Sequence, residues 1–208
     1  MKKITVSKDL LSHLPHVKIV DFLSEVKVEP LNEALTYAMD SRLGIIQSAF
    51  EVGQIASIDN IKWGRTVYRK LGKDPTKYRL SSEKLIRRVI KGEGIEHINN
   101  VVDLANWLSV ELKAPIGVYD VNKIKGDIVM DYGRSGETYR CLAGYELNLE
   151  GLPLLRDDFG PFGSSTADSV RTAVDENTTQ AILCIYLFNP EEEESEYLKM
   201  TTSFFKRL

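Results

Sequence analysis

The segment NNVVDLANWLSVELKAPIGVYD, residues 99–120, constrains the fold more than any other part of the chain, because its apolar side chains occupy more than one face of a helix. We expect Asp103 to cap this helix through its carboxylate and Pro115, which lacks an amide donor, to end it. One apolar stripe has helical spacing and comprises Leu104, Ala105, Leu108 and Leu112. Val102 and Val110 continue the apolar surface around the helix, which predicts that the helix is buried.

Asn106 lies between these two valines, four residues from each, on a face that should therefore be covered. A buried amide needs hydrogen-bond partners, because an unpaired one costs free energy in an apolar environment. Two interpretations follow. The amide of Asn106 either bonds to neighbouring backbone, or it lines a polar pocket.

The remaining pattern divides the chain into a mostly helical first part and a mostly β second part. Helices are expected from Pro30 to about Phe50, over 65–71, and in a short basic helix that Ser81 or Ser82 caps and Gly92 stops. Strands are expected at 4–6, 17–23, 116–121, 127–132, 138–147 and 181–187, with GRSG at 133–136 as a hairpin turn. This order predicts an α+β fold rather than repeated β-α-β units.

The length of 208 residues and the absence of a linker-like stretch favour a single domain over residues 1–208. The first residues contain lysines but no apolar run long enough for a signal peptide, and no window resembles a membrane-spanning helix. Cys141 and Cys184 lie far apart in strand-like runs, which favours buried, reduced thiols. We therefore expect a cytoplasmic protein that does not contact membranes.

Positive charge is concentrated in one part of the sequence. Residues 62–91 contain eleven Lys and Arg and only two acidic residues, although the whole chain has a net charge of -3. Such a region can receive a polyanion such as RNA through neutralisation of its phosphates, and Lys84, Arg87 and Arg88 are the expected RNA contacts. The alternative is a pair of solvated helix faces without a partner.

Several kinds of chemistry lack a recognisable motif. His13, His16 and His97 have no partner at zinc-ligand spacing, which predicts no metal site. Neither a GxxxxGK[ST] phosphate loop nor a GxGxxG motif after a strand is present, so we expect no nucleotide cofactor.

The segment DDFGPFGSSTADSVRT, residues 157–172, is the best candidate for a polar site. Its glycines and proline suit a sharply bent backbone that can expose amides to a ligand. Its hydroxyls and its Asp–Arg pair could orient a polar substrate or a water, whereas ordinary turn chemistry is the alternative. The polar or glycine residues concerned are Gly163, Ser164, Thr166, Asp168, Ser169, Arg171 and Thr172.

Residues 62–190 resemble a known family, the tRNA-editing module (domains B-three and B-four) of the phenylalanyl-tRNA synthetase beta subunit. The segment beginning NNVVD resembles that module's NNVVD-(T)NYV-LELG-P-HAFD segment, and GLPLLRDDFGPFGSSTADSVRTAVDENTTQAILCIYLFNP resembles its end. LGKDPTKYRLSSEKLIRRVIKGEGI is similar to free-standing versions of the module, which leaves residues 1–61 as an extension packed on it.

The resemblance implies an α+β fold with a β-sandwich of unusual topology flanked by helices. It also implies a pocket that hydrolyses tyrosine wrongly esterified to tRNA, with Asn106 matching an asparagine of the pocket wall. Two positions depart from the family: Gly117 stands where a histidine is expected and Cys184 where a glutamate is expected, so the editing mechanism does not transfer directly.

Two hypotheses for function stay open. In the first, the protein is an aminoacyl-tRNA deacylase that acts in trans: Asp168 or Ser169 orients the water, amides around 163–166 hold the oxyanion, and Arg171 meets a phosphate or carboxylate. In the second, it is a module that binds tRNA or an amino acid and has lost the chemistry. The sequence does not specify the amino acid, the tRNA or the oligomeric state, and the chain shows no adenylate-forming motif of a ligase.

Overall fold

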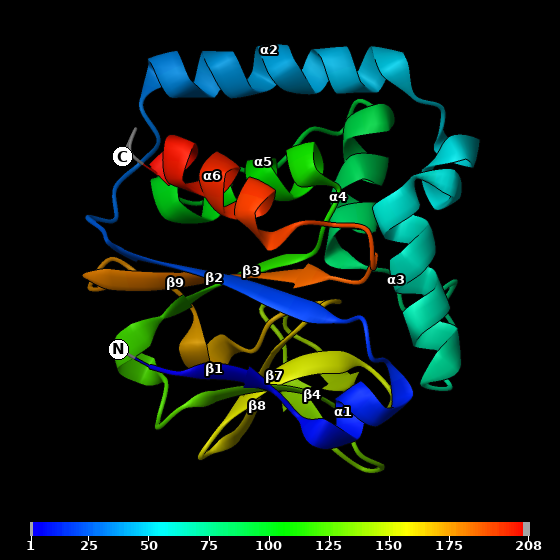
Figure 1. The fold of residues 1–208 in the computed structure, drawn as a ribbon. Helices are drawn as coiled ribbons and strands as arrows, with labels where there is room; N and C mark the ends of the chain where they lie inside the picture. The colour runs from blue at the N-terminus through cyan, green and yellow to red at the C-terminus, as the bar shows by residue number, and fades with distance from the viewer. Residues whose placement is uncertain (1, 206–208) are drawn as a thin grey trace.

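Two β-sheets lie face to face, and helices cover the outer side of one of them, in the computed structural model of residues 2–205 (Figure 1). The three-stranded sheet has the antiparallel order β2 (Lys18–Glu25), β9 (Gln180–Leu187), β3 (Ile116–Asp120). The four-stranded sheet has the order β1 (Ile4–Val6), β4 (Ile128–Tyr132), β7 (Pro153–Asp157), β8 (Gly160–Ser164), with β1 parallel to β4. A separate hairpin joins β5 (Thr138–Arg140) to β6 (Glu146–Asn148). The expected α+β class is confirmed.

Five helices lie on the outer side or at one end of the three-stranded sheet: α2 (Glu33–Ala49), α3 (Asp59–Lys70), α4 (Ser81–Ile90), α5 (Asn100–Leu112) and α6 (Glu194–Phe205). Helix α1 (Lys8–His13) packs instead against β4 of the four-stranded sheet. Short 3-10 turns are η1 (Val52–Ser57), η2 (Val121–Lys123) and η3 (Val170–Thr172). Figure 1 shows α5 and α6 directly above the three-stranded sheet, α2 outside them, and α3 and α4 at the side. Among residues 2–205, no helix is long and apolar enough to cross a membrane.

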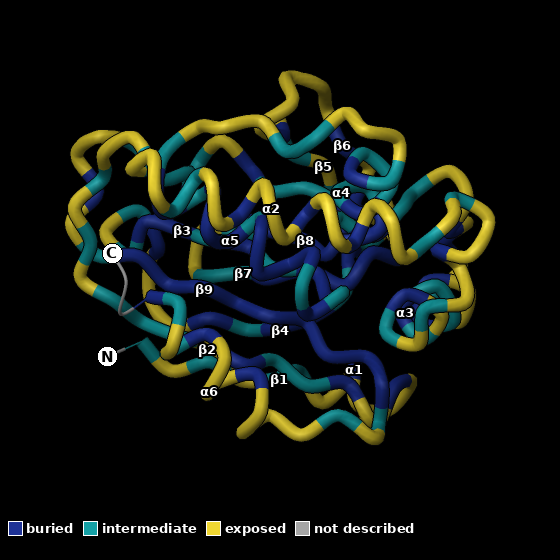
Figure 2. The backbone as a smooth tube through the Cα atoms, turned by 90° about the horizontal axis from the view of Figure 1, so that it is seen from above, coloured by how far each residue is buried: buried dark blue, intermediate teal, exposed yellow. Residues whose placement is uncertain are grey.

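Both β1 and β2 belong to the first 61 residues, yet each strand is built into a sheet with later strands. Strand β1 pairs with β4, and β2 pairs with β9 along its whole length. Strand β9 has one sheet neighbour on each side, and seven of its eight residues are buried (Figure 2). The N-terminal segment is therefore part of the hydrophobic core.

Helix α5 is buried as its apolar pattern predicts, because its side chains meet α4, α6 and the three-stranded sheet. Its N-cap is Asn99, whose side chain accepts from the amide of Val102, so the prediction of Asp103 as the cap is wrong. Asp103 lies in the first turn and accepts instead from the amide of Ile98 and bonds to His97. The helix ends before Pro115, at Lys113, which adopts a left-handed conformation with φ of 56°.

Other local predictions are also corrected. Residues 138–147 are not one strand, because the chain turns between β5 and β6. GRSG at 133–136 is a turn but not a hairpin, since β4 and β5 do not pair with each other. Neither Ser81 nor Ser82 caps α4, whose N-cap position is Leu80, and Gly160–Ser164 forms strand β8 rather than loop.

Candidate functional site

The two positions that depart from the resemblance lie side by side. Gly117 on β3 and Cys184 on β9 are cross-strand partners, so they share one face of the three-stranded sheet. Tyr119, two residues after Gly117, shares that face because side chains alternate along a strand. Tyr119 stacks edge-on against Phe162 of β8, which shows that this face is turned toward the four-stranded sheet.

The side chain of Tyr119 covers two glycines. A Cβ atom placed on Gly117 or on Gly163 would overlap the Tyr119 hydroxyl. Glycine at both positions therefore leaves the room that the phenol ring occupies between the sheets. The sequence predicts no polar replacement for the histidine and glutamate of the resemblance, but the structure places a phenol there.

Asp168 is the hydrogen-bond partner of this phenol. The Tyr119 hydroxyl donates to Oδ1 of Asp168 at 2.8 Å, and the amide of Ser164 donates to the same oxygen at 3.2 Å. Burial raises the pKa of Asp168 to about 7, although both hydrogen bonds and the nearby charge of Lys84 act in the opposite direction. A carboxyl group with this pKa can accept a proton near neutral pH.

The polar loop around Asp168 is held by its own hydroxyls and by three tyrosines. Ser164 Oγ accepts from the amide of Ala167 and donates to the carbonyl of the same residue. The buried Tyr68 hydroxyl bonds to Ser165 Oγ and to Thr166 Oγ1, each at 2.7 Å, and Tyr139 donates to the carbonyl of Ala167. These contacts fix the loop to α3 and β5 as well as to β3.

The amides that we expected to hold an oxyanion are already engaged. The amide of Ser164 donates to Asp168, that of Ser165 to the carbonyl of Pro153, and that of Thr166 to Ser164 Oγ. The loop is thus internally satisfied. An oxyanion would have to use other donors or exchange one of these bonds.

Lys84 of α4 points to this loop and is not part of an exposed basic surface. Its ammonium donates to the carbonyl of Thr166 at 3.0 Å, and burial lowers its pKa. The amide of Ser81 donates to the carbonyl of Ser165, so the first turn of α4 is attached to the loop at two points. Lys84 is therefore placed to influence Asp168 electrostatically.

Arg171 pairs with Asp157 and not with Asp168. Its guanidinium donates to both carboxylate oxygens of Asp157, at 3.0 and 2.9 Å, and to the carbonyl of Gly160. Ser169 Oγ accepts from the amide of Arg171 and so caps η3, while Thr172 is fully buried. These three residues hold the end of the loop against the β7–β8 hairpin.

Asn106 lies apart from this cluster. It is half-buried on α5, on the helical side of the three-stranded sheet, whereas Asp168 lies on the side of the four-stranded sheet. Within residues 2–205, no hydrogen bond connects the Asn106 side chain to the loop. The three-stranded sheet therefore lies between Asn106 and the loop.

The basic region of the sequence is divided by the fold into paired and unpaired cations. Glu83, whose side chain is fully buried, has three arginines around Oε1: Arg65 at 2.9 Å, Arg87 at 3.7 Å and Arg79 at 3.8 Å. Arg88 bonds instead to Glu96 and to the carbonyl of Gly94. Of the three expected RNA contacts, only Arg87 lies at this arginine cluster.

Neither cysteine is disposed for catalysis or metal binding. Cys141 and Cys184 are free and buried, as expected, and burial raises the pKa of Cys184 well above its usual value. Among the described residues, no group of three or more His, Cys, Asp or Glu side chains could hold a metal ion.

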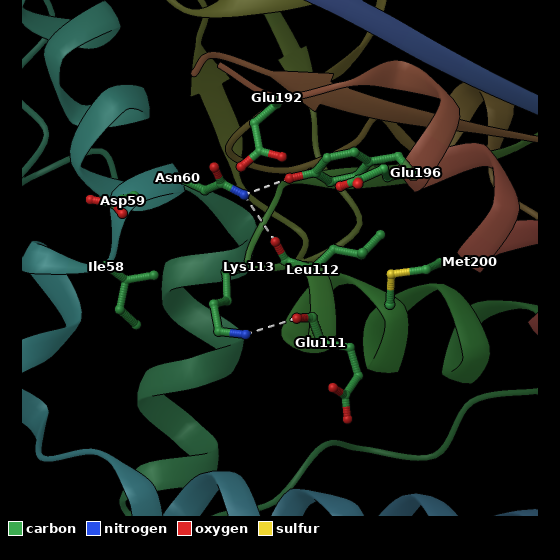
Figure 3. A pocket seen from close by; sticks show the side chains of 10 residues that line it. Ile58, Asp59, Asn60, Glu111, Leu112, Lys113, Glu192, Glu196 and Met200 are labelled. Carbon is green, nitrogen blue, oxygen red and sulfur yellow. Dashed lines mark hydrogen bonds between the residues drawn. The ribbon is translucent and has the colours of Figure 1, made fainter. Parts of the chain in front are cut away.

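A separate hollow of about 340 Å³ lies where α3, α5 and α6 meet (Figure 3). Asn60 at its wall donates to the carbonyl of Leu112 at 3.0 Å and to the hydroxyl of Tyr197 at 2.7 Å, which ties the three helices together. Four acidic residues and one lysine line it: Asp59, Glu111, Glu192, Glu196 and Lys113. This negative charge makes the hollow unsuitable for a phosphate-bearing ligand.

Sequence reasoning missed Tyr119, Tyr68 and Tyr139. The sequence GVYD could have indicated Tyr119. A glycine two residues before a tyrosine in a strand lies on the same face and leaves room for the tyrosine ring. Asp168, the hydrogen-bond partner of Tyr119, could not be predicted from the local sequence, because it is 49 residues away.

The fold and this site define an α+β domain with a polar cluster enclosed between two sheets. The family of the B3/4 domain matches residues 63–208, and the chain belongs to this family. The expected relationship to the B-three and B-four domains of the phenylalanyl-tRNA synthetase beta subunit is confirmed.

The related sequences are much longer than this chain. The phenylalanine–tRNA ligase beta subunit of Brucella abortus is 29% identical over 111 residues, which is 52% of this chain and 14% of that protein. The corresponding subunit of Aquifex aeolicus is 30% identical over 99 residues, 47% of this chain and 13% of that protein. An N-terminal fragment of the beta subunit from Pyrococcus horikoshii, a solved structure, has 15% identity and a TM-score of 0.43 over 90% of this chain and 43% of that one. The chain thus spans about one seventh of the matched ligase subunits.

Proposed function

We propose that the protein hydrolyses the ester bond between an amino acid and tRNA in trans, in the cytoplasm, with Asp168 as the general base. Membership of the B3/4 domain family supports the class of substrate, since the relatives in which the domain occurs are tRNA ligase subunits. The observation that carries the proposal is the Asp168–Tyr119 pair: a carboxyl group with a pKa of about 7, oriented by a phenol and an amide.

The chemistry requires only water and the ester. Asp168 accepts a proton from water as the water oxygen attacks the ester carbonyl carbon. The tetrahedral intermediate then breaks its bond to the ribose oxygen, and that oxygen takes the proton from Asp168. Oδ1 is held by Tyr119 and Ser164, which leaves Oδ2, without a partner among residues 2–205, to face the water.

The experiment is release of amino acid from mischarged tRNA by the purified protein. Asp168→Asn is expected to lower the rate at least about 100-fold, because general-base catalysis typically contributes a factor of this size or more. Asp158→Asn, an exposed carboxylate of the same segment, is the matched control and should retain the rate. Undiminished release by Asp168→Asn would overturn the assignment.

The second candidate is a module that binds tRNA or an amino acid without hydrolysing the ester. It is favoured by two observations: Tyr119 fills the space above Gly117 and Gly163, and the amides of Ser164 to Thr166 are internally bonded. Salt-sensitive tRNA binding without release of amino acid would support this candidate over the first.

A further inference from the structure

A hollow of about 400 Å³ between η1 and α3 is lined by cations and small residues, with no acidic residue in its wall. The cations are Lys62, Arg65 and Arg69, and the small residues are Gly53, Ala56 and Ser57. We call this the basic hollow. The spacing of its cations, i, i+3 and i+7, places all three on one face of α3.

Two of the three cations of the basic hollow make no ion pair with other residues of the part that the structure describes. Lys62 and Arg69 are exposed, and no ion pair or side-chain hydrogen bond within residues 2–205 involves either of them. Arg65 bonds to the buried Glu83. Two of the three cations are therefore free to bind an external anion.

The arginine cluster around Glu83 extends this positive surface. Arg79 and Arg87 approach the same carboxylate oxygen as Arg65, so three positive charges face one negative charge, and both side chains are partly exposed. Acidic residues near this surface are Asp59 in the first turn of α3, Glu51 before η1, and Asp74, whose pKa is lowered mainly by hydrogen bonds from Thr76 and least by the charge of Arg65. The surface from Lys62 to Arg87 thus has an excess of positive charge.

Other cations from the same part of the sequence are committed elsewhere. Lys73 is buried and donates to the carbonyl of Asn148, and Lys84 donates to that of Thr166. Arg88 and Lys91 pair with Glu96 and Glu93. Lys70 and Lys77 are also exposed and make no ion pair among residues 2–205, but neither lines the hollow. The basic hollow and the adjoining arginines are where several available cations of residues 62–91 lie together.

We propose that the basic hollow binds the phosphate backbone of tRNA. This inference rests on the proposed function for the choice of RNA and specifies the surface that receives it. Lys62 and Arg69 are seven residues apart, about 10 Å along the helix axis at about 1.5 Å per residue, so they can contact different phosphates of one strand. Such contacts to phosphates depend on charge and do not distinguish one RNA base sequence from another.

The test is binding of uncharged tRNA at several salt concentrations by the full chain. The variant K62E/R69E is expected to bind at least about 10-fold more weakly at 0.1 M salt, and the slope of log affinity against log salt should fall in magnitude by about 1.5 to 2. K8E/K125E makes the same charge change at exposed lysines on the side of the four-stranded sheet and should bind nearly as the wild type does.

A second variant tests the hollow without removing a cation. Ala56→Glu adds a carboxylate at an exposed wall residue and should also weaken binding. Undiminished tRNA affinity in K62E/R69E and Ala56→Glu, or equal losses in K8E/K125E, would overturn the inference, as would a wild-type protein that does not bind tRNA.

The proposed hydrolysis can fail without affecting this result. Hydrolysis is measured separately on a small aminoacyl ester of adenosine, which lacks the tRNA body. K62E/R69E is expected to act on that ester as the wild type does, while losing affinity for tRNA. If the wild type binds tRNA through the hollow but releases nothing from either substrate, only the proposed function fails.

Discussion

The hydroxyl of Tyr119 donates a hydrogen bond of 2.8 Å to Asp168. This hydroxyl occupies the space that a side chain on residue 117 would otherwise fill. Residue 117 is glycine and its cross-strand partner on β9 is Cys184, so neither position supplies an acid or a base. The carboxyl group of the sheet on this face belongs to Asp21, the partner of Cys184 on β2, which is one strand further away and exposed. The polar pair is supplied instead by the next residue on that face of β3 and by the loop after β8. This arrangement makes the pair, and not position 117 or 184, the feature to test.

Tyr119→Phe is expected to move the pH dependence of hydrolysis. The hydrogen bond from Tyr119 lowers the pKa of Asp168, so its removal should shift the base-limited inflection from about pH 7 to higher pH. Rates measured between pH 5 and pH 9 on mischarged tRNA provide the test. A lower rate with an unmoved inflection would show that Tyr119 has only a structural role.

The ionisation of Asp168 should also affect stability. Its pKa is raised on folding from about 3.8 to about 7, so the protonated carboxyl favours the folded state: the contribution is fully present below pH 4 and is lost as pH rises through 7. The loss is at most about 4 kcal/mol. Asp168→Asn, which does not ionise, should lose less stability between pH 5 and pH 8 in urea titrations than the wild type, and parallel losses would contradict this prediction.

Gly117→Ala should be destabilising through a clash with one particular side chain. The added methyl overlaps the Tyr119 hydroxyl, and such overpacking typically costs about 1–3 kcal/mol. In a Tyr119→Leu background the same change should cost at least about 1 kcal/mol less, because the two residues are in contact and their effects couple. Additive costs in this double-mutant cycle would show that the strain lies elsewhere.

The elements with strong local signals were predictable from the sequence. Helix α5 and strand β9 have long apolar patterns, and both are buried where those patterns place them. Errors arose where local signals competed. Asp103 and Asn99 are both residue types that favour the N-cap position. The Asp103 carboxylate is hydrogen-bonded to the amide of Ile98 and to His97, and Asn99 caps the helix. Strand β8 was missed because FGPFG is typical of a turn, whereas its pairing with β7 decides its conformation.

The site was predictable as a segment but not as a set of contacts. The density of hydroxyls in 157–172 identified Asp168 and Ser164, which do meet. The pairing of Arg171 with Asp157 rather than with Asp168 follows from the β7–β8 turn, which was not expected. Likewise, the charge of residues 62–91 was visible, but which cations Glu83 would engage depended on how α3 and α4 pack.

Arg171→Ala should make the protein less stable at neutral pH, because the Asp157 carboxylate is fully buried and would lose its bidentate partner. Loss of one partner of a buried ion pair typically costs about 3–5 kcal/mol. Burial alone would raise the pKa of Asp157, but Arg171 and two backbone amides outweigh it and hold the pKa below its usual value. That stability is present above the unfolded pKa and lost as pH falls, so the gap between wild type and Arg171→Ala in urea titrations should narrow below pH 4. A constant gap would contradict this account.

Glu83→Gln should separate stability from RNA affinity. The Glu83 side chain is fully buried, and Arg65, whose side chain is only 14% exposed, would lose its charged partner. We expect a loss of about 3–5 kcal/mol in the free energy of unfolding from urea titrations. Glu96→Gln is the matched control. It removes the partner of Arg88 at a site where Glu96 is 77% exposed, and it should cost less than about 1 kcal/mol. Because Glu83→Gln removes the negative charge at the arginine cluster, tRNA affinity under conditions where the variant is folded should not fall. Weaker tRNA binding by folded Glu83→Gln would mean that the geometry Glu83 imposes on these arginines, and not their charge alone, is what RNA recognises.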